Sequence, residues 1–163
     1  MSDFQQYLNF NEEDNKRRQL EVYADTHISA LAERRIAAIS APQQWLVLGE
    51  PFCPDCRVFV PFVQKFAELN PNIKIKYVAR KNYHERSRFD SDEQQKLVVE
   101  THNIPSLFRI ENDTTRLVLK EFPEFFKQRA EQAPDQKDQL KADYRAGKFN
   151  EELERELVKL FTV

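Results

Sequence analysis

The chain contains very little glycine, with Gly49 and Gly147 the only two in 163 residues. A loop that wraps the phosphates of a nucleotide needs several glycines within a few residues, because the backbone must approach the phosphates closely. Two isolated glycines cannot build such a loop. We therefore expect no direct nucleotide binding.

The sequence also lacks a dominant charge and a long apolar run. Its 25 basic and 27 acidic residues leave a formal charge of −2, so no broad positive field exists to attract nucleic acid. No apolar stretch approaches the roughly 20 residues that cross a bilayer. Residues 1–6 carry no cationic-plus-apolar signal segment. These absences predict a cytoplasmic protein that binds neither nucleic acid nor a membrane.

Cysteine is equally scarce, and its two copies lie three residues apart in Phe52-Cys53-Pro54-Asp55-Cys56. In a reducing compartment a solitary C-x-x-C is more often catalytic than structural. An apolar run, Trp45–Leu48, directly precedes it and predicts a strand that leads into a helix. The amides and dipole at a helix start stabilise a thiolate, so we predict that Cys53 is a nucleophile. Cys56, one turn later, would resolve a mixed disulfide.

Two other interpretations of the cysteine pair are open. The pair is half of a tetrahedral zinc site, but the other half would have to come from histidines without the usual H-x3-5-H spacing: His27, His84 and His102. The cysteines could also be small buried apolar side chains. A neighbouring proline and the charged Asp55 make this a poor place for burial. We predict no metal and no cofactor.

Helix and strand patterns place the cysteines between two parallel strands. Residues 73–80 alternate apolar and polar side chains and predict a strand. Cys56 lies on the apolar stripe of a helix that joins it to the strand at 45–48, and such a crossover makes the two strands parallel. A helix at about 91–101 follows, and then a hairpin with strands at 106–111 and 116–121. One or two helices are expected before Pro42 and three after residue 121.

Three marks occur in order along this frame: the C-x-x-C at a helix start, Pro61 five residues after Cys56, and Ile104-Pro105 before a later strand. With these marks, residues from about Trp45 to Glu121 resemble the thioredoxin superfamily. More finely, the chain resembles bacterial thioredoxin-like proteins with a [WF]-C-x-D-C active site. The resemblance implies that Pro105 is cis and packs against the cysteines.

The resemblance implies an α/β fold, a thioredoxin-like three-layer α/β/α sandwich with extra N- and C-terminal helices. We expect a single domain over residues 1–163. Its parts are an N-terminal helical extension (1–41), a core (42–121) and C-terminal helices (122–163).

The departures from thioredoxin bear on the chemistry. Phe52 replaces a tryptophan, and Val47 falls where thioredoxin carries a buried aspartate. Glu50 is the nearest carboxylate and the candidate base for deprotonating Cys56; a solvated glutamate at a strand end is the alternative. The Asp55 charge should oppose thiolate formation, which favours a reductant or mild exchanger.

The function implied by the resemblance is thiol–disulfide oxidoreductase chemistry, with Cys53 and Cys56 reducing or exchanging disulfides of cytosolic proteins. Its expected partners are a protein or small-molecule disulfide and an upstream thiol reductant. The backbone of Ile104 would pair with an extended peptide. The expected substrate-binding residues are Phe52, Pro54, Asp55, Ile104 and Pro105. The alternative is a redox-sensing adaptor or binding protein on the same fold.

Overall fold

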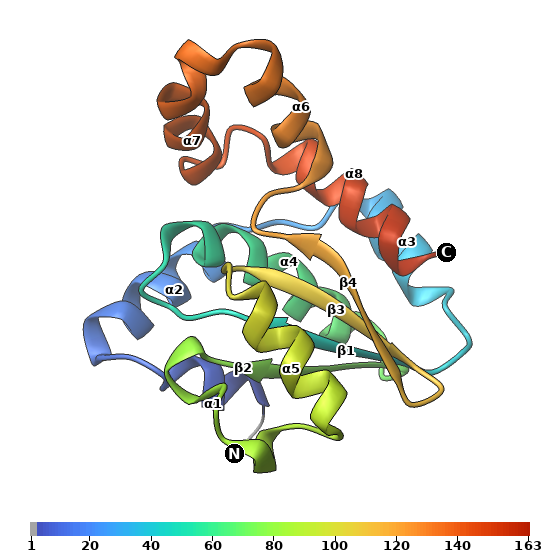
Figure 1. Ribbon diagram of the computed structural model, residues 1–163. Coiled ribbons are helices and arrows are strands. Elements are labelled where there is room, and N and C mark those ends of the chain that lie inside the picture. The colour runs from blue at the N-terminus through green and yellow to red at the C-terminus, as the bar shows by residue number, and fades with distance from the viewer. Residues whose placement is uncertain (1–2) are drawn as a thin grey trace.

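A four-stranded sheet forms the middle layer of the computed structural model, which describes residues 3–163 (Figure 1). The strand order is β2-β1-β3-β4. The central strand β1 (Gln43–Leu48) runs parallel to β2 (Ile73–Val78) and antiparallel to β3 (Ser106–Glu111). The last strand, β4 (Thr114–Lys120), pairs antiparallel with β3. The predicted parallel pair and hairpin are confirmed.

Local sequence explains these strands. The apolar run of β1 is buried from Trp45 to Leu48 because helices cover both faces of the sheet. The hairpin turns through Asn112 and Asp113, whose φ angles of 49° and 65° suit a tight turn. β4 therefore begins at Thr114, two residues earlier than predicted.

Helices pack on both faces of the sheet, as Figure 1 shows. α4 (Pro54–Leu69) covers one face, and α5 (Asp92–Thr101) covers the other. Ser91 caps α5 by accepting a hydrogen bond from the backbone N–H of Gln94, as its sequence predicts. The predicted thioredoxin-like α/β arrangement is confirmed.

Three helices precede the sheet rather than the one or two expected: α1 (Asp3–Leu8), α2 (Glu13–Asp25) and α3 (Ala30–Ala37). α1 was missed because six residues are too few to establish a helical period. It packs beside β2, where Tyr7 meets Tyr77 with ring centroids 5.0 Å apart. α2 packs against α4.

The C-terminal segment forms α6 (Glu124–Gln132), α7 (Lys137–Arg145) and α8 (Asn150–Phe161), with a 3-10 turn at Pro134–Gln136. α8 inserts Phe161 between Trp45 and Phe66, at centroid distances of 4.1 and 5.3 Å. α7 packs against α4. The predicted single-domain organisation and its internal boundaries stay predictions. None of the helices in residues 3–163 is long and apolar enough to span a membrane.

Candidate active site

The two cysteines lie at the start of α4, and four residues separate Cys53 from the end of β1. Cys53 is the N-cap of the helix, with φ −82° and ψ 121°, and Pro54 is its first residue. Proline suits this position, because its missing N–H has no intrahelical partner there. Cys53 is 8% exposed, whereas Cys56 is completely buried. The two thiols are therefore not equivalent: only Cys53 reaches the surface.

The pKa values of the thiols shift in opposite directions. A hydrogen bond from the Cys56 side chain is the main cause that lowers the pKa of Cys53, and backbone N–H groups of Cys56 and Asp55 add to it against the effect of burial. Burial is the main cause that raises the pKa of Cys56 well above its usual range, followed by its interaction with Cys53. The arrangement favours a thiolate on Cys53 and a thiol on Cys56.

The segment before β3 lies against Cys53. The peptide bond between Ile104 and Pro105 is cis, as predicted. The sulfur of Cys53 lies 3.9 Å from the carbonyl oxygen of Ile104, toward which it donates its proton. Ile104 and both cysteines belong to the apolar cluster on the α5 side of the sheet. The structure thus brings together the cysteine pair and the Ile104-Pro105 segment, although Cys53 and Ile104 are 51 residues apart in the sequence.

Asp55 corrects the expectation that a charge at this helix start prevents burial. Its side chain is only 7% exposed, and both of its oxygens accept from Arg145 of α7, at 2.9 Å from Nε and 3.2 Å from Nη2. Its charge does act to raise the pKa of Cys53, as expected, but the hydrogen bonds described above outweigh it. The sequence argument against buried cysteines therefore fails, because both thiols and the carboxylate between them are buried.

Glu50 is buried at 4% exposure, which rules out the solvated alternative. Its carboxylate accepts a hydrogen bond from Asn11 at 3.0 Å. A hydrogen bond from the backbone of Glu50 to Cys56 acts to lower the pKa of Cys56 and so offsets part of the rise caused by burial. Val47, which occupies the place of an aspartate in thioredoxin, is a fully buried apolar residue. The backbone of Glu50 thus lies beside Cys56, and the role of Glu50 as a base stays a prediction.

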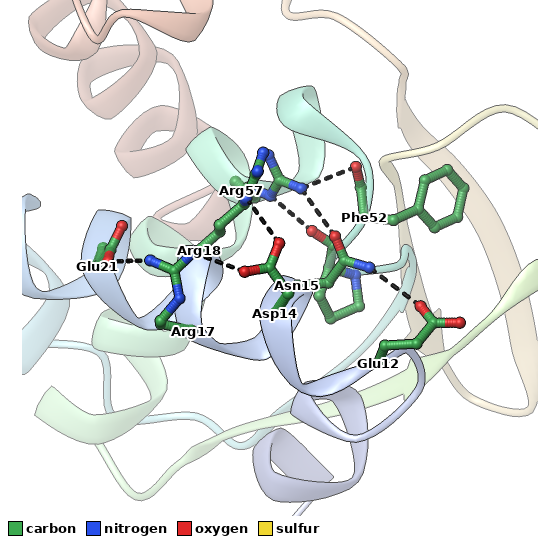
Figure 2. Close-up of polar contacts among 9 residues, drawn as sticks. Glu12, Asp14, Asn15, Arg17, Arg18, Glu21, Phe52 and Arg57 are labelled. Atoms are coloured by element: carbon green, nitrogen blue, oxygen red, sulfur yellow. Dashed lines mark hydrogen bonds and ion pairs between the residues drawn. The ribbon is translucent and has the colours of Figure 1, made fainter.

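The loop that leads into Cys53 is held by residues that sequence reasoning missed. The side-chain oxygen of Asn11 accepts from the backbone N–H of Phe52 at 2.9 Å. Arg57 donates to the carbonyl oxygens of Pro51 at 2.7 Å and Phe52 at 3.1 Å, and to Asn15 at 3.1 Å (Figure 2). Asn11 and Asn15 lie about 40 residues before their partners, and no local pattern marks such contacts.

Two buried tyrosines flank the dithiol from opposite ends of the chain. Tyr7 of α1 donates to the side chain of Gln19 at 2.7 Å, and Gln19 donates to the backbone oxygen of Arg57 at 3.1 Å. The hydroxyl of Tyr144, on α7, has no hydrogen-bond partner within residues 3–163. Burial is the main cause that raises the pKa of each tyrosine well above its usual range, and nearby Cys56 contributes to both. Both phenols are therefore neutral near pH 7.

The other expected substrate-binding residues frame Cys53 at the surface. Phe52 is 44% exposed, and Pro54 is also exposed. Together with Cys53 they form the accessible rim of the site. Within the described part of the chain, residues 3–163, no group of three or more His, Cys, Asp or Glu side chains is placed to hold a metal ion.

Comparisons with known proteins agree with this geometry. The family model Thioredoxin_9, described as thioredoxin, matches residues 1–141. No curated protein matches the chain significantly. The crystal structure of a Pseudomonas aeruginosa protein of unknown function has a TM-score of 0.69 at 20% identity, covering 99% of this chain and 89% of its own. The crystal structure of an HIV epitope scaffold has a TM-score of 0.60 at 18% identity, covering 89% and 90%.

These two structural likenesses concern the fold alone. The family match is more specific, because it spans the helices before the sheet, the cysteine pair, the cis-proline segment and most of α7. The chain belongs to the thioredoxin family.

Proposed function

We propose that the protein is a thiol–disulfide oxidoreductase that reduces or exchanges disulfides through Cys53 and Cys56. The observation that carries the proposal is the asymmetry of the pair. Cys53 lies at a helix start with a lowered pKa, and Cys56 is buried behind it with a raised pKa. A lowered pKa makes Cys53 a thiolate that can attack a disulfide. A raised pKa keeps Cys56 protonated until the mixed disulfide has formed.

In the proposed reaction the Cys53 thiolate attacks one sulfur of a substrate disulfide. The substrate S–S bond breaks, a Cys53–substrate disulfide forms, and the departing substrate thiolate takes up a proton. Cys56 then loses its proton and attacks the Cys53 sulfur, which releases the second substrate thiol. Two electrons pass to the substrate and leave a Cys53–Cys56 disulfide. An upstream dithiol reductant restores the starting state.

Glu50 is the proposed acceptor of the Cys56 proton in the second step. Two observations support this role: the carboxylate is buried, and the backbone of the same residue contacts Cys56. Glu50→Gln should slow the release of a mixed disulfide and leave its formation by Cys53 unchanged. Stopped-flow measurement of both steps tests this, and equal release rates would remove Glu50 from the mechanism.

The finer placement among bacterial proteins with a [WF]-C-x-D-C site is part of the same proposal, as is action in the cytoplasm. Phe52, Pro54, Ile104 and Pro105 are the proposed contacts for a substrate. Asp55 was expected to join them, and its pairing with Arg145 gives it a different role, argued below.

A redox sensor or adaptor is the second candidate, and the burial of both thiols favours it. Cys53 exposes only 8% of its surface, which restricts access by large substrates. In this candidate Cys53 and Cys56 pair with each other and change a partner surface. Catalytic turnover of insulin disulfides by the protein with excess dithiothreitol separates the candidates: turnover supports the oxidoreductase.

Trapping of substrates is the main test of the proposed function. Cys56→Ser should leave Cys53 attached to its protein substrates through mixed disulfides, which dithiothreitol reduces. Cys53→Ser is the matched control, because it removes the same type of atom from the other end of the pair. Equal capture by the two variants, with thiol content verified in both, contradicts the oxidoreductase proposal.

A further inference from the structure

An ion pair links the residue between the two cysteines to the C-terminal helices. Asp55 follows the nucleophile by two residues, and Arg145 comes from α7, outside the sheet and its covering helices. Both oxygens of the carboxylate are engaged, at 2.9 and 3.2 Å. The Asp55 side chain is 7% exposed, and that of Arg145 is 42% exposed. The carboxylate is therefore desolvated and depends on one arginine for compensation.

The charges around Cys53 come from few groups. Asp55 disfavours a thiolate at Cys53, and Arg145 interacts favourably with both. Glu121, after β4, also interacts electrostatically with Arg145. Titratable groups that face the nucleophile from the packed helices are Cys56 and Asp55 of α4, Tyr7 of α1, and Tyr144 and Arg145 of α7. The tyrosines and Cys56 are neutral near pH 7, because their pKa values are raised. The charged groups near the thiolate also include Arg57 and the buried Glu50, and the Asp55–Arg145 pair is the charged contact that comes from the C-terminal helices.

We propose that Arg145 is a positioning residue for the nucleophile: it holds the Asp55 carboxylate in place and compensates its charge, so that Cys53 reacts as a thiolate near neutral pH. The C-terminal helices thereby take part in the chemistry of a site to which they contribute no thiol. The biological meaning of this inference rests on the proposed function, but the reactivity of Cys53 can be measured without turnover.

Charge compensation predicts opposite effects from the two ends of the pair. Arg145→Gln leaves the Asp55 carboxylate desolvated and uncompensated beside Cys53. Its negative charge then disfavours a second negative charge, the Cys53 thiolate. Asp55→Asn leaves the guanidinium uncompensated, and its positive charge favours the thiolate. The double variant carries neither charge. A role in packing alone predicts that both single variants loosen the helix start and act in the same direction.

The experiment is the rate of Cys53 alkylation by iodoacetamide between about pH 5 and 10, with mass mapping of the adduct. We expect Arg145→Gln to move the midpoint up by about one pH unit, so alkylation at pH 7 falls roughly tenfold. Asp55→Asn should move the midpoint down, and the double variant should return close to the wild-type value. Arg145→Lys keeps the charge but not the planar fork, so its midpoint should rise less than that of Arg145→Gln.

Lys148→Gln is the matched control, because it removes another cation of the same segment, one that pairs with Asp143 at 3.3 Å. Its midpoint should stay at the wild-type value. The proposal is overturned if Arg145→Gln leaves the midpoint unchanged, or if both single variants move it in the same direction without rescue in the double variant. If Arg145→Gln does not fold by circular dichroism, the opposite shifts required of Arg145→Lys and Asp55→Asn decide the question.

This test is separable from that of the proposed function. Absence of insulin turnover in the wild-type protein would count against the oxidoreductase, while the alkylation midpoints would still report on Arg145. Normal turnover combined with an unchanged midpoint in Arg145→Gln would retain the enzyme and reject the role of Arg145.

Discussion

The N-terminal and C-terminal extensions both reach the cysteine loop, but they contact different parts of it. Asn11, before α2, accepts a hydrogen bond from the backbone of Phe52 at 2.9 Å. Asn15, within α2, accepts one at 3.1 Å from Arg57, which holds the same loop. α7 contacts a charge after Cys53, through the Asp55–Arg145 ion pair. The first region holds the backbone before Cys53, and in our proposal the second sets the charge beside the Cys53 thiol. Damage to the two should therefore appear in different measurements, stability for the first and pH dependence for the second.

The largest expected loss of stability is at Arg57, which holds two carbonyl groups of the loop and the side chain of Asn15. Arg57→Met keeps much of the side-chain volume and removes all three hydrogen bonds. Hydrogen bonds from charged groups contribute about 1.5–3 kcal/mol each and are not additive, so we expect the free energy of unfolding to fall by roughly 3 kcal/mol. Urea denaturation measures it.

Arg17→Met is the control for Arg57→Met. Arg17 lies on α2, is mostly exposed, and pairs with Asp14 and Glu21, each at 2.6 Å. Exposed pairs of this kind contribute less than about 1 kcal/mol. Equal losses in the two variants would contradict the view that the N-terminal region acts through the cysteine loop.

The two buried tyrosines, one from each extension, should differ in what loss of the hydroxyl does to the free energy of unfolding, and the expected changes are smaller than that at Arg57. Tyr7→Phe removes the hydrogen bond to Gln19, whose side chain is completely buried and would keep an unsatisfied oxygen, at a cost of about 1–2 kcal/mol. Tyr144→Phe removes a buried hydroxyl that has no hydrogen-bond partner within residues 3–163. Its free energy of unfolding should rise, or change by less than about 0.5 kcal/mol. A larger loss at Tyr144 than at Tyr7 would reverse the comparison.

The last comparison of stability concerns Asn11, which links the Glu50 carboxylate to the backbone of Phe52. Asn11→Ala should lower the free energy of unfolding by about 1 kcal/mol, since neither partner is completely enclosed once the side chain is removed. The exposed Gln6 lies in the same region, and Gln6→Ala is the control, expected within about 0.5 kcal/mol of wild type. A change at Asn11 no larger than that at Gln6 would remove it from the support of the loop.

Much of the fold could be predicted because its signals are local. The alternation in β2, the apolar run of β1 and the Ser91 cap each lie within a few residues of the element they specify. The cysteine pair and Ile104-Pro105 could be named as one site only through the family resemblance, and the 3.9 Å contact brings them together. α1 escaped prediction because it has fewer than two turns.

The parts of the site that could not be predicted depend on long-range contacts. Asp55 reads as an exposed charge until Arg145, 90 residues later, is placed against it. Glu50 reads as a strand-end glutamate until Asn11 and the surrounding chain bury it. A single sequence contains no record of which polar side chains meet across such distances. A buried charge therefore has to be found from the folded chain.

The most direct test of the account is the order in which the two cysteines are alkylated as the pH rises. The pKa of Cys53 is lowered and that of Cys56 is raised, so the thiolate of Cys53 is populated at lower pH and reacts first. We predict that iodoacetamide modifies Cys53 with a midpoint below the ordinary value of about 8.5, and that Cys56 in the native protein stays unmodified at neutral pH. Earlier modification of Cys56, or equally slow modification of both, would contradict the assignment of nucleophile and resolving thiol.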